Sequence, residues 1–567
     1  MNYGQNKFLP LNLGGITQNK SIMHISNFFI GLIFIVFSST AYTQIDKNID
    51  EIYKGFTDSP GAAVAIYEDG SVTFRKGYGI ANMDHKIPIQ SNTVFDTGSI
   101  SKQFTAACIF LLEQQGKLSI DDPIQKFLPE MPQYNGEVVS IRNLINHTSG
   151  LRDYVEIMVY AGNSFNNIFT EEMGLDIMSR QMESNFTPGE KFMYNNGGYL
   201  LLAIIVRRAS GISIGQFAAK HIFEPLGMKS TFILENPNRI IENSATGYTR
   251  LKKGDYEKLH YLNVAIGGDG QVYTTVEDLH KWDNNFYGPK VGGKALLEFF
   301  NEPGILNNGN VTNYSAGLFI EEYKGHKIVQ HTGAWGGFVG GIFRLPDLKK
   351  TVVILSNNRF SAPHIKSYQI IDMLIPKAQS KIKIQDELKT YKLKKRLLRN
   401  YEGLFEVKGE PHRRLLTYLE NDSLRVKQYW NKKDFVLVPT AKGRFFEKNE
   451  PYHKFYFDEI NHILKIEERI SSLETKRTIP FEPLVDLSKY EGEYYSKDVG
   501  STYVIKSEET TLRVLRGEKE IYNLDQVSEH VFGQDLLGIQ FSEFNGEMQY
   551  FLLQDRRVRN LKFIKLK

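Results

Sequence analysis

The sequence has little of several features on which many proteins depend. Its 567 residues contain one cysteine, Cys108, so no internal disulfide can form, and none lies near the N-terminus for lipid attachment. The 13 histidines include no His-x-x-x-His pair, and low-complexity tracts are absent. The sequence therefore predicts a folded chain with no metal and no cofactor, in which Cys108 is a small buried residue of a helix.

The sequence also lacks a large excess of charge of either sign. The 69 Lys and Arg residues nearly balance 65 Asp and Glu residues, giving a formal net charge of +4. Such a balance lacks the concentrated basic face that nucleic-acid binding needs, so no nucleic-acid partner is expected. Hydrophobic residues make up 41% of the chain, enough to offset the entropy of folding. At this length, roughly two to four domains are expected.

Long apolar runs are missing except for one near the N-terminus. Lys20 precedes the run Phe28 to Phe37, and small residues follow it up to Ala41. This run is shorter than the ~20 apolar residues that cross a bilayer. The pattern is typical of a signal peptide over residues 1–44 that is cleaved, with translation starting at Met1 or Met23. We therefore expect a periplasmic or secreted protein without a stable membrane span.

The next part of the chain, residues 45–378, has the character of a mixed α and β domain. Runs rich in β-forming residues, such as Ala62 to Tyr67, alternate with stretches of helical periodicity, such as Lys102 to Gln115. Residues 379–398 then change composition: they are rich in lysine and arginine and contain no glycine or proline. That composition predicts a solvated basic linker helix and a domain boundary.

Beyond the linker, short runs of alternating aromatic or β-branched residues predict antiparallel strands. The tripeptide Tyr-Glu-Gly opens one such segment at Tyr401 and recurs at Tyr490. We therefore predict two small β-barrels in tandem, over residues 399–482 and 483–567. A single continuous β-sandwich with a chance repeat of the tripeptide is the alternative, because sandwiches and barrels share these patterns.

A serine and a lysine stand three residues apart where a helical pattern begins. Side chains at positions i and i+3 lie on one face of a helix, so the amine of Lys102 can reach the hydroxyl of Ser99 and take its proton. The spacing alone is weakly specific. Ser380 and Lys383 repeat it in the linker, where no apolar helix follows.

Two further patterns supply groups that such a pair would need. Tyr194-Asn195-Asn196 places a phenol and an amide in a loop before a buried apolar run, where the phenol could shuttle a proton. Tyr261-Leu262-Asn263 and Tyr429-Trp430-Asn431 have the same pattern, so context must decide among them. His331-Thr332-Gly333 follows strand-like residues, and a strand beside the serine could bind an extended substrate and donate an N–H to an oxyanion.

Taken in order, Ser-x-x-Lys, Tyr-x-Asn and His-x-Gly resemble the serine β-lactamase and penicillin-binding-protein family. The resemblance covers roughly residues 50–360. It extends to Asn143 through Leu151, to Gly267-Gly268 and to a closing strand that ends at Asn357. The branch in question includes class C β-lactamases, D-alanyl-D-alanine carboxypeptidases, D-aminopeptidases and related esterases. It implies an α+β fold: a β-lactamase/transpeptidase-like antiparallel sheet flanked by helices, followed here by the two lipocalin-like barrels.

The resemblance also implies a role for each residue. Ser99 would attack a carbonyl, Lys102 and Tyr194 would share the acid and base steps, and Asn196 would line the site. The backbone N–H groups of Ser99 and Ala334 would form the oxyanion hole, beside His331, Thr332 and Gly333. Many β-lactamases have lysine where this chain has His331. A largely uncharged histidine binds a substrate carboxylate less well, which disfavours penicillins and favours a D-peptide or an ester.

The expected function is therefore an exported serine hydrolase that acts through an acyl-enzyme on a D-amino-acid peptide or amide. Its substrate would be a small molecule or peptide, with cell-wall fragments a plausible source. A carboxylesterase or weak β-lactamase using the same serine is one alternative, and a non-catalytic penicillin-binding-like receptor is another. The barrels could narrow the site, bind a polymer or mediate a homodimer, and resemblance of fold does not choose among these roles.

Overall fold

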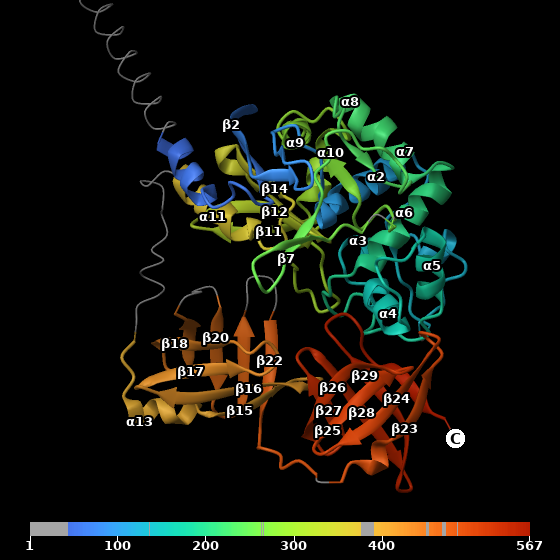
Figure 1. Cartoon of the computed structure of the whole chain (residues 1–567), viewed down its shortest axis with the longest axis vertical. Coiled ribbons are helices and arrows are strands. Elements are labelled where there is room, and N and C mark those ends of the chain that lie inside the picture. Colours follow the sequence, from blue (N-terminus) through green and yellow to red (C-terminus); the bar gives the residue numbers. More distant parts are fainter. Residues whose placement is uncertain are drawn as a thin grey trace, which may run out of the picture. The chain divides into compact units, whose positions relative to one another are not determined.

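The computed structural model describes residues 44–134, 136–261, 263–264, 266–375, 391–448, 453–467, 472–484 and 486–566. Nearly all of the predicted signal peptide lies outside the described residues, as does most of the predicted linker helix, of which α13 (Lys395–Leu398) is described. The chain divides into two units, of which the second begins at Phe56. The second unit holds every element described below (Figure 1).

A seven-stranded sheet organises the first domain of this unit. In spatial order its strands are β10 (Tyr314–Ser315), β11 (Leu318–Tyr323), β12 (His326–Trp335), β13 (Phe338–Leu345), β14 (Lys350–Ser356), β1 (Ala62–Glu68) and β2 (Ser71–Tyr78). Every neighbouring pair is antiparallel. In β1, Ala62 to Tyr67 are all buried, which places this strand in the interior of the sheet.

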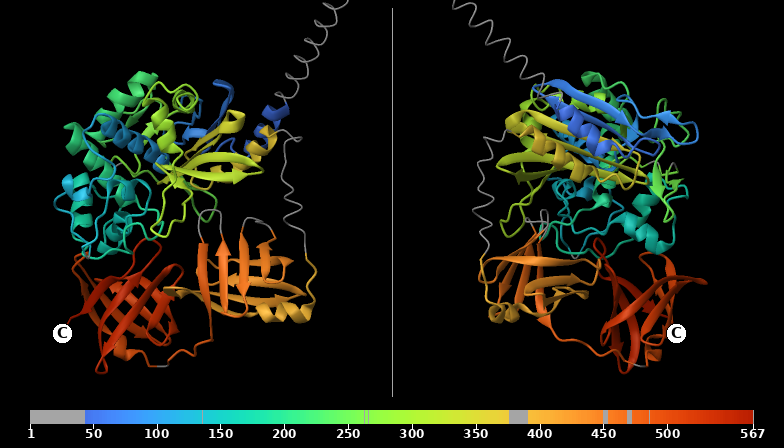
Figure 2. Two further views of the ribbon diagram at one scale, coloured as in Figure 1. Left: turned by 180° about the vertical axis from the view of Figure 1, so that it is seen from behind. Right: turned by 60° about the vertical axis from the view of Figure 1, so that its left-hand side comes forward.

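Helices cover both faces of this sheet. Phe343 and Arg344 are neighbours on β13, so their side chains point to opposite faces. The Phe343 ring lies 5.4 Å from that of Tyr368 on α11 (Pro363–Leu374). The Arg344 guanidinium donates from Nε to Asp283 of α9 (Val276–Asn284) at 2.7 Å, with both side chains buried. Helices α9 and α11 therefore pack on opposite faces, as the views in Figure 2 show.

Other helices of this domain form a layer beside the sheet. They are η1 (Gly98–Ser101), α2 (Lys102–Gln114), η2 (Ile124–Lys126), α3 (Ile141–Ile145), α4 (Tyr154–Ala161), α5 (Glu171–Ser179), α6 (Asn196–Ser210), α7 (Ile214–Ala218), η3 (Ala219–Phe223), α8 (Glu224–Leu226) and α10 (Gly293–Phe300). Short strands connect them: β3 (Ile80–Asn82), β4 (Ile87–Pro88), β5 (Phe95–Asp96), β6 (Phe232–Ile233), β7 (Tyr248–Arg250), β8 (Tyr256–Lys258) and β9 (Val272–Thr274).

Helices α2 and α6 pack against each other at the centre of this layer. All side chains from Tyr199 to Val206 of α6 are buried, as expected for a helix that is apolar on every side. Helix α6 begins at Asn196 because the side chain of Asn195 caps it, accepting a hydrogen bond from the Gly198 N–H at 2.8 Å. Cys108 is buried within α2, as predicted, and burial raises the pKa of its thiol.

The C-terminal part forms two closed barrels of eight strands each, so the tandem arrangement is confirmed and the single sandwich is wrong. The first barrel consists of β15 (Gly403–Val407), β16 (Glu410–Glu420), β17 (Ser423–Gln428), β18 (Asp434–Ala441), β19 (Arg444–Glu447), β20 (Lys454–Asp458), β21 (Ile463–Glu467) and β22 (Ser472–Thr478). The second consists of β23 (Gly492–Ser496), β24 (Ser501–Glu508), β25 (Thr511–Arg516), β26 (Lys519–Ser528), β27 (Val531–Gln534), β28 (Leu537–Phe544), β29 (Glu547–Gln554) and β30 (Leu561–Lys565). The predicted limits of the domains stay predictions.

The repeated Tyr-Glu-Gly tripeptide has the same structural role in both barrels. Tyr401 and Tyr490 each end a short 3-10 helix directly before the first strand of a barrel. Both side chains are buried and pack on aromatic rings of their own barrel, Tyr401 on Phe445 and Tyr490 on Phe541. The repeat therefore marks an aromatic side chain that enters each barrel where its first strand begins.

Within the described ranges, no individual helix combines the length and apolar character needed to cross a bilayer. Within the same ranges, α6 and the segment 214–226 are long and apolar enough only when taken together, and the two are bent by 74° relative to each other. The fold class predicted from the sequence, an antiparallel sheet with helices followed by two lipocalin-like barrels, is confirmed.

Candidate active site

Ser99 and Lys102 lie where η1 passes into α2. The Lys102 side-chain nitrogen, Nζ, is 3.1 Å from the Ser99 hydroxyl oxygen, one helical turn away. Lys102 is completely buried, and Nζ also donates to the side-chain oxygen of Asn196 at 2.9 Å and to the backbone oxygen of Asp269 at 2.8 Å. Three separate segments of the domain therefore hold this one amine.

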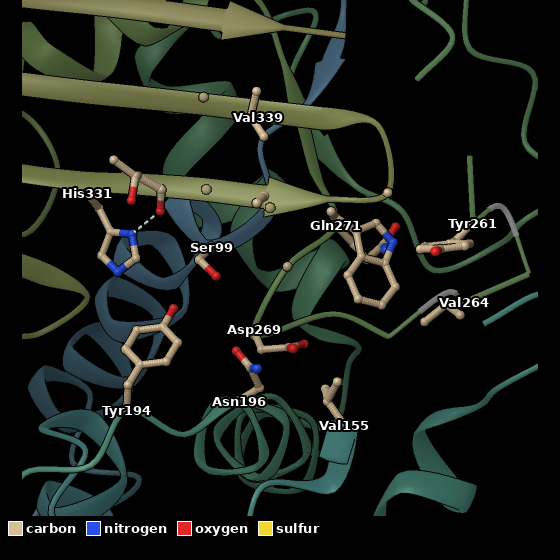
Figure 3. A pocket seen from close by; sticks show the side chains of 18 of the residues that line it. Ser99, Val155, Tyr194, Asn196, Tyr261, Val264, Asp269, Gln271, His331 and Val339 are labelled. Carbon is tan, nitrogen blue, oxygen red and sulfur yellow. Dashed lines mark hydrogen bonds between the residues drawn. The ribbon is translucent and has the colours of Figure 1, made fainter. Parts of the chain in front are cut away.

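Tyr194 comes to the same point from the loop before α6. Its ring centroid lies 4.9 Å from Lys102 Nζ, and in Figure 3 its hydroxyl points toward Ser99. The hydroxyl is buried and has no hydrogen-bond partner among the residues that the structure describes. A buried hydroxyl without a partner is uncommon in proteins, so this group is available to a bound substrate.

Strand β12 runs directly beside η1, and two glycines permit the approach. A Cβ atom added to Gly333 would lie 1.9 Å from the backbone oxygen of Thr97, and one added to Gly98 would lie 2.6 Å from the Ala334 nitrogen. No larger residue fits at either position without separating the two segments. The backbone of Ala334 is thereby held next to that of Ser99, while Thr332 follows His331 on the same strand.

His331 is buried and uncharged. Its Nδ1 donates to the backbone oxygen of Thr332 (Figure 3), so Nε2 is the acceptor for the Tyr314 hydroxyl, 3.3 Å away. Burial, together with the positive charge of Lys102, lowers the pKa of His331 to about 3. Strand β12 therefore presents no cation to the site, which agrees with the sequence-based expectation of a weak anion site at this position.

Two aspartates of the site were not among the residues predicted from the sequence. Asp153 is fully buried, and its Oδ2 accepts hydrogen bonds from the backbone N–H of Asn196 at 2.9 Å and from its side-chain amide at 3.1 Å. Asp153 therefore turns the Asn196 side-chain oxygen toward Lys102. Asp269 follows the Gly267-Gly268 pair, and burial raises its pKa to about 6 although Lys102 opposes that shift.

Ser99, Tyr194, Asn196, Asp269 and His331 line a cavity of about 680 Å³ (Figure 3). Most of its wall is apolar or aromatic, contributed by Val155, Phe165, Phe192, Leu259, Tyr261, Val264, Ile266, Phe319, Trp335 and Val339. Its ionisable side chains, besides the tyrosines, are Asp269, His331, Arg359, His364 and Arg557. Arg557 belongs to the second barrel, which the sequence did not connect with the site.

The other copies of the short patterns lie elsewhere or differ in role. Ser380 and Lys383 lie outside the described residues. Tyr261 lines the cavity, but Asn263 donates to the backbone oxygen of Asn166. Tyr429 and Asn431 lie between β17 and β18 of the first barrel. In the described part of the chain, no three His, Cys, Asp or Glu side chains are grouped so that they could hold a metal ion.

A seven-stranded antiparallel sheet with helices on both faces, and a serine one helical turn from a lysine beside it, defines the class of serine hydrolases that form acyl-enzymes. Comparison with known proteins gives the family. The Beta-lactamase family model matches residues 49–371, somewhat more than half of the chain. The chain belongs to the β-lactamase family of serine hydrolases, which confirms the family and the enzyme class predicted from the sequence.

Curated relatives match the catalytic domain over about half of this chain. Penicillin-binding protein 4* of Bacillus subtilis is 35% identical over 308 residues, which are 52% of this chain and 67% of that protein. D-aminopeptidase of Brucella anthropi is 27% identical over 311 residues, 53% of this chain and 56% of that protein. The chain thus spans little more than half the length of the D-aminopeptidase.

Among solved structures, the octameric penicillin-binding protein homologue from Pyrococcus abyssi has a TM-score of 0.54 at 25% identity. The match covers 76% of this chain and 99% of that one. The octamer is a property of the Pyrococcus protein, and the homodimer expected from the present sequence stays a prediction.

Substitution of Gly333 tests the close approach of β12 to η1. In Gly333→Ala the added Cβ must push the strand away from Thr97, which displaces the backbone of Ala334. We expect turnover of p-nitrophenyl acetate to fall by about 100-fold or more, the effect of losing one oxyanion donor. Gly288→Ala is the control, because its Cβ would meet only the Asn284 oxygen at 4.0 Å. Turnover by Gly333→Ala above half of the unsubstituted rate would contradict this geometry.

Proposed function

We propose that this hydrolase cleaves amide or peptide bonds of D-amino-acid substrates through an acyl-enzyme on Ser99. The observation that carries the proposal is the arrangement around Lys102, whose amine contacts the Ser99 hydroxyl and two further oxygen acceptors. Acylation by this route requires a base at hydrogen-bond distance from the serine proton, and Lys102 meets that requirement.

The hydrogen-bond inventory of Lys102 supports its role as the base. The Asn196 side-chain oxygen and the Asp269 backbone oxygen can only accept. A neutral amine has two N–H donors and one lone pair, so it satisfies both oxygens and still accepts the proton of Ser99. After that transfer, the resulting ammonium group donates to the same three oxygens. The site therefore suits the amine before and after the proton moves.

Tyr194 is proposed to carry the proton onward. Its hydroxyl has no partner among the described residues, and its ring lies against Lys102. A leaving-group nitrogen bound between Ser99 and Tyr194 could accept the phenolic proton as the C–N bond breaks, while Lys102 resupplies it. Water would then attack the acyl-enzyme with the same groups acting in reverse. The N–H groups of Ser99 and Ala334 would stabilise the oxyanion in both steps.

The substrate class rests on the relatives and on His331. One relative is named a D-aminopeptidase and another a penicillin-binding protein, which supports a D-amino-acid substrate for this chain. The neutral His331 offers little attraction to a carboxylate at the position where many β-lactamases have lysine, which argues against efficient β-lactam hydrolysis. Within the family, we therefore favour an amide or peptide of a D-amino acid, with cell-wall fragments as a natural source.

Mass spectrometry of the intact protein tests the nucleophile. Incubation with a fluorophosphonate is expected to add one adduct to the wild-type protein and none to Ser99→Ala. Lys102→Ala should slow adduct formation by about 100-fold or more, the contribution of a general base. Ser101→Ala serves as the control serine, since its hydroxyl accepts from the Val272 N–H away from Lys102. An adduct on Ser99→Ala would assign the nucleophile to another residue, and the absence of an adduct on the wild type would favour the non-catalytic receptor.

Turnover of a matched set of substrates tests the bond and the configuration. We expect D-alanyl p-nitroanilide to be hydrolysed at least about tenfold faster than its L isomer, because the fixed oxyanion site and Tyr194 orient the substituents of the substrate. The same serine could also act on esters, and the apolar cavity wall would accept them. A higher kcat/KM for p-nitrophenyl acetate than for both anilides would assign the enzyme as a carboxylesterase.

We also propose that the protein is exported, on the strength of the short apolar run that follows Lys20. Cleavage after the small residues near Ala41 would release a periplasmic or secreted enzyme. In a bacterial expression host, the mature protein is expected in the periplasmic or medium fraction, with an N-terminus close to residue 45 by mass spectrometry. Recovery of the uncleaved chain from the cytosol would contradict the proposal.

A further inference from the structure

A loop of the second barrel is docked into the catalytic domain. It connects β29 to β30 and spans residues 555–560. The guanidinium of Arg152 donates to the backbone oxygens of Arg559 at 3.0 Å and Asn560 at 2.8 Å, and to the carboxylate of Asp498 at 2.6 Å. Arg152 is fully buried, and besides these three bonds it donates to the side-chain oxygen of Gln181 in its own domain at 3.2 Å. This arginine therefore fixes the position of the loop.

The middle of the loop is held from a second side. The backbone oxygen of Arg557 accepts from the Asp153 N–H at 3.3 Å and from the Asn185 side chain at 3.0 Å. The side-chain oxygen of Asn185 in turn accepts from the Arg559 N–H at 2.6 Å. Because the main chain is anchored at residue 557 and again at residues 559 and 560, the direction of the Arg557 side chain is set by the docking and not by a free loop.

The side chain of Arg557 enters the active-site cavity. Its guanidinium carbon lies 5.1 Å from the centroid of the Tyr194 ring, and its Nη1 lies 3.3 Å from Asp153 Oδ2. Asp153 is the residue that orients Asn196. The barrel thus delivers a cation to the side of the cavity formed by Tyr194 and Asn196.

Arg557 has hydrogen-bond donors to spare. A guanidinium carries five N–H groups, and in the described part of the chain only the long contact with Asp153 uses one of them. Asp153 has further donors, because Asn196 and the Val155 N–H donate to its two oxygens. The Arg557 side chain is 28% exposed, against none for Asp153. Its remaining donors can therefore meet a ligand.

The charges of Asp153 and Glu156, which do not line the cavity, act on Arg557, and the described lining residues add no carboxylate close to it. The one aspartate of the described lining, Asp269, lies on the Lys102 side, where its hydroxyl partner is Tyr154. His331 is uncharged, and Arg359 adds a second guanidinium to the wall. Inside an otherwise apolar wall, a guanidinium with free donors favours a planar anion that accepts two hydrogen bonds.

We propose that Arg557 of the second barrel is a specificity-determining residue, and that it binds a carboxylate of the substrate within the active-site cavity. The inference rests on the proposed function, because it assumes that substrates react at Ser99. It names the substrate class more closely: a D-amino-acid amide or peptide that carries a carboxylate near the bond that is cleaved. The carboxylate could belong to the acyl part or to the leaving group, and the two can be distinguished by experiment.

Two pairs of substrates separate these sources. In the first pair, N-succinyl-D-alanine p-nitroanilide and N-acetyl-D-alanine p-nitroanilide differ by a carboxylate on the acyl part. In the second pair, N-acetyl-D-alanyl-D-alanine and its C-terminal amide differ by a carboxylate on the leaving group. The quantity measured is the ratio of kcat/KM for the charged substrate to that for the neutral one, which cancels general losses of activity.

We expect one of the two substrate pairs to respond, with a charged-to-neutral ratio of kcat/KM of at least about ten in the wild type. In Arg557→Ala this ratio should fall by about ten- to 100-fold, because a hydrogen bond to a charged group is lost. Arg557→Glu should make the neutral substrate the preferred one, and Arg557→Lys should retain part of the preference for the charged substrate. Arg556→Ala is the matched control, because this neighbouring arginine is exposed and does not line the cavity, and it should keep the wild-type ratio. The pair that responds identifies the position of the carboxylate.

An unchanged ratio in Arg557→Ala and Arg557→Glu, for both pairs, would overturn the inference. If the wild type hydrolyses none of the four substrates, calorimetric binding of N-succinyl-D-alanine to Ser99→Ala decides instead. Arg557→Ala in that background should weaken binding at least tenfold, and equal affinities would again overturn the inference. Failure of the proposed function is distinguishable, because it removes the fluorophosphonate adduct of the wild type whatever residue stands at position 557.

Discussion

The amine of Lys102 is the point on which the catalytic domain depends. It is buried among the Ser99 hydroxyl of η1, the Asn196 amide at the start of α6 and the backbone of the loop that contains Asp269. Burying an amine is unfavourable unless every hydrogen bond is made, so each of these segments must hold its oxygen in place. The packing of α2 against α6, both apolar on nearly every side, provides that rigidity.

Much of this arrangement could be predicted from the sequence, because it is encoded in short patterns. Ser99 and Lys102 face each other through helical spacing alone, and the cap at Asn195 explains why Tyr194 and Asn196 lie on either side of a helix start. The glycine of the His331-Thr332-Gly333 pattern lies where β12 passes the backbone of Thr97. The barrels were predictable for a different reason. Aromatic or β-branched residues alternate with other residues along their strands, and the Tyr-Glu-Gly tripeptide recurs before the first strand of each barrel.

Other parts of the site carry no local signal. Asp153 is one aspartate among many, and only the folded chain shows that it holds Asn196. Arg557 lies in a turn between two strands, some 400 residues along the chain from Asp153, and nothing in the turn distinguishes it from Arg556. Its position results from the docking of one domain on another through Arg152, an interaction that depends on tertiary packing and not on periodicity or spacing.

The place of the β29–β30 loop in the barrel has a consequence for biogenesis. A ribosome makes the segment with Ser99 early, and the loop is followed by β30, the strand that pairs with β23 and closes the barrel. A catalytic domain that folds while the chain is still being synthesised therefore has its serine and lysine before it has Arg557. Completion of the cavity wall is coupled to closure of the last barrel, so a nascent or truncated chain would differ from the finished enzyme in the molecules that it admits.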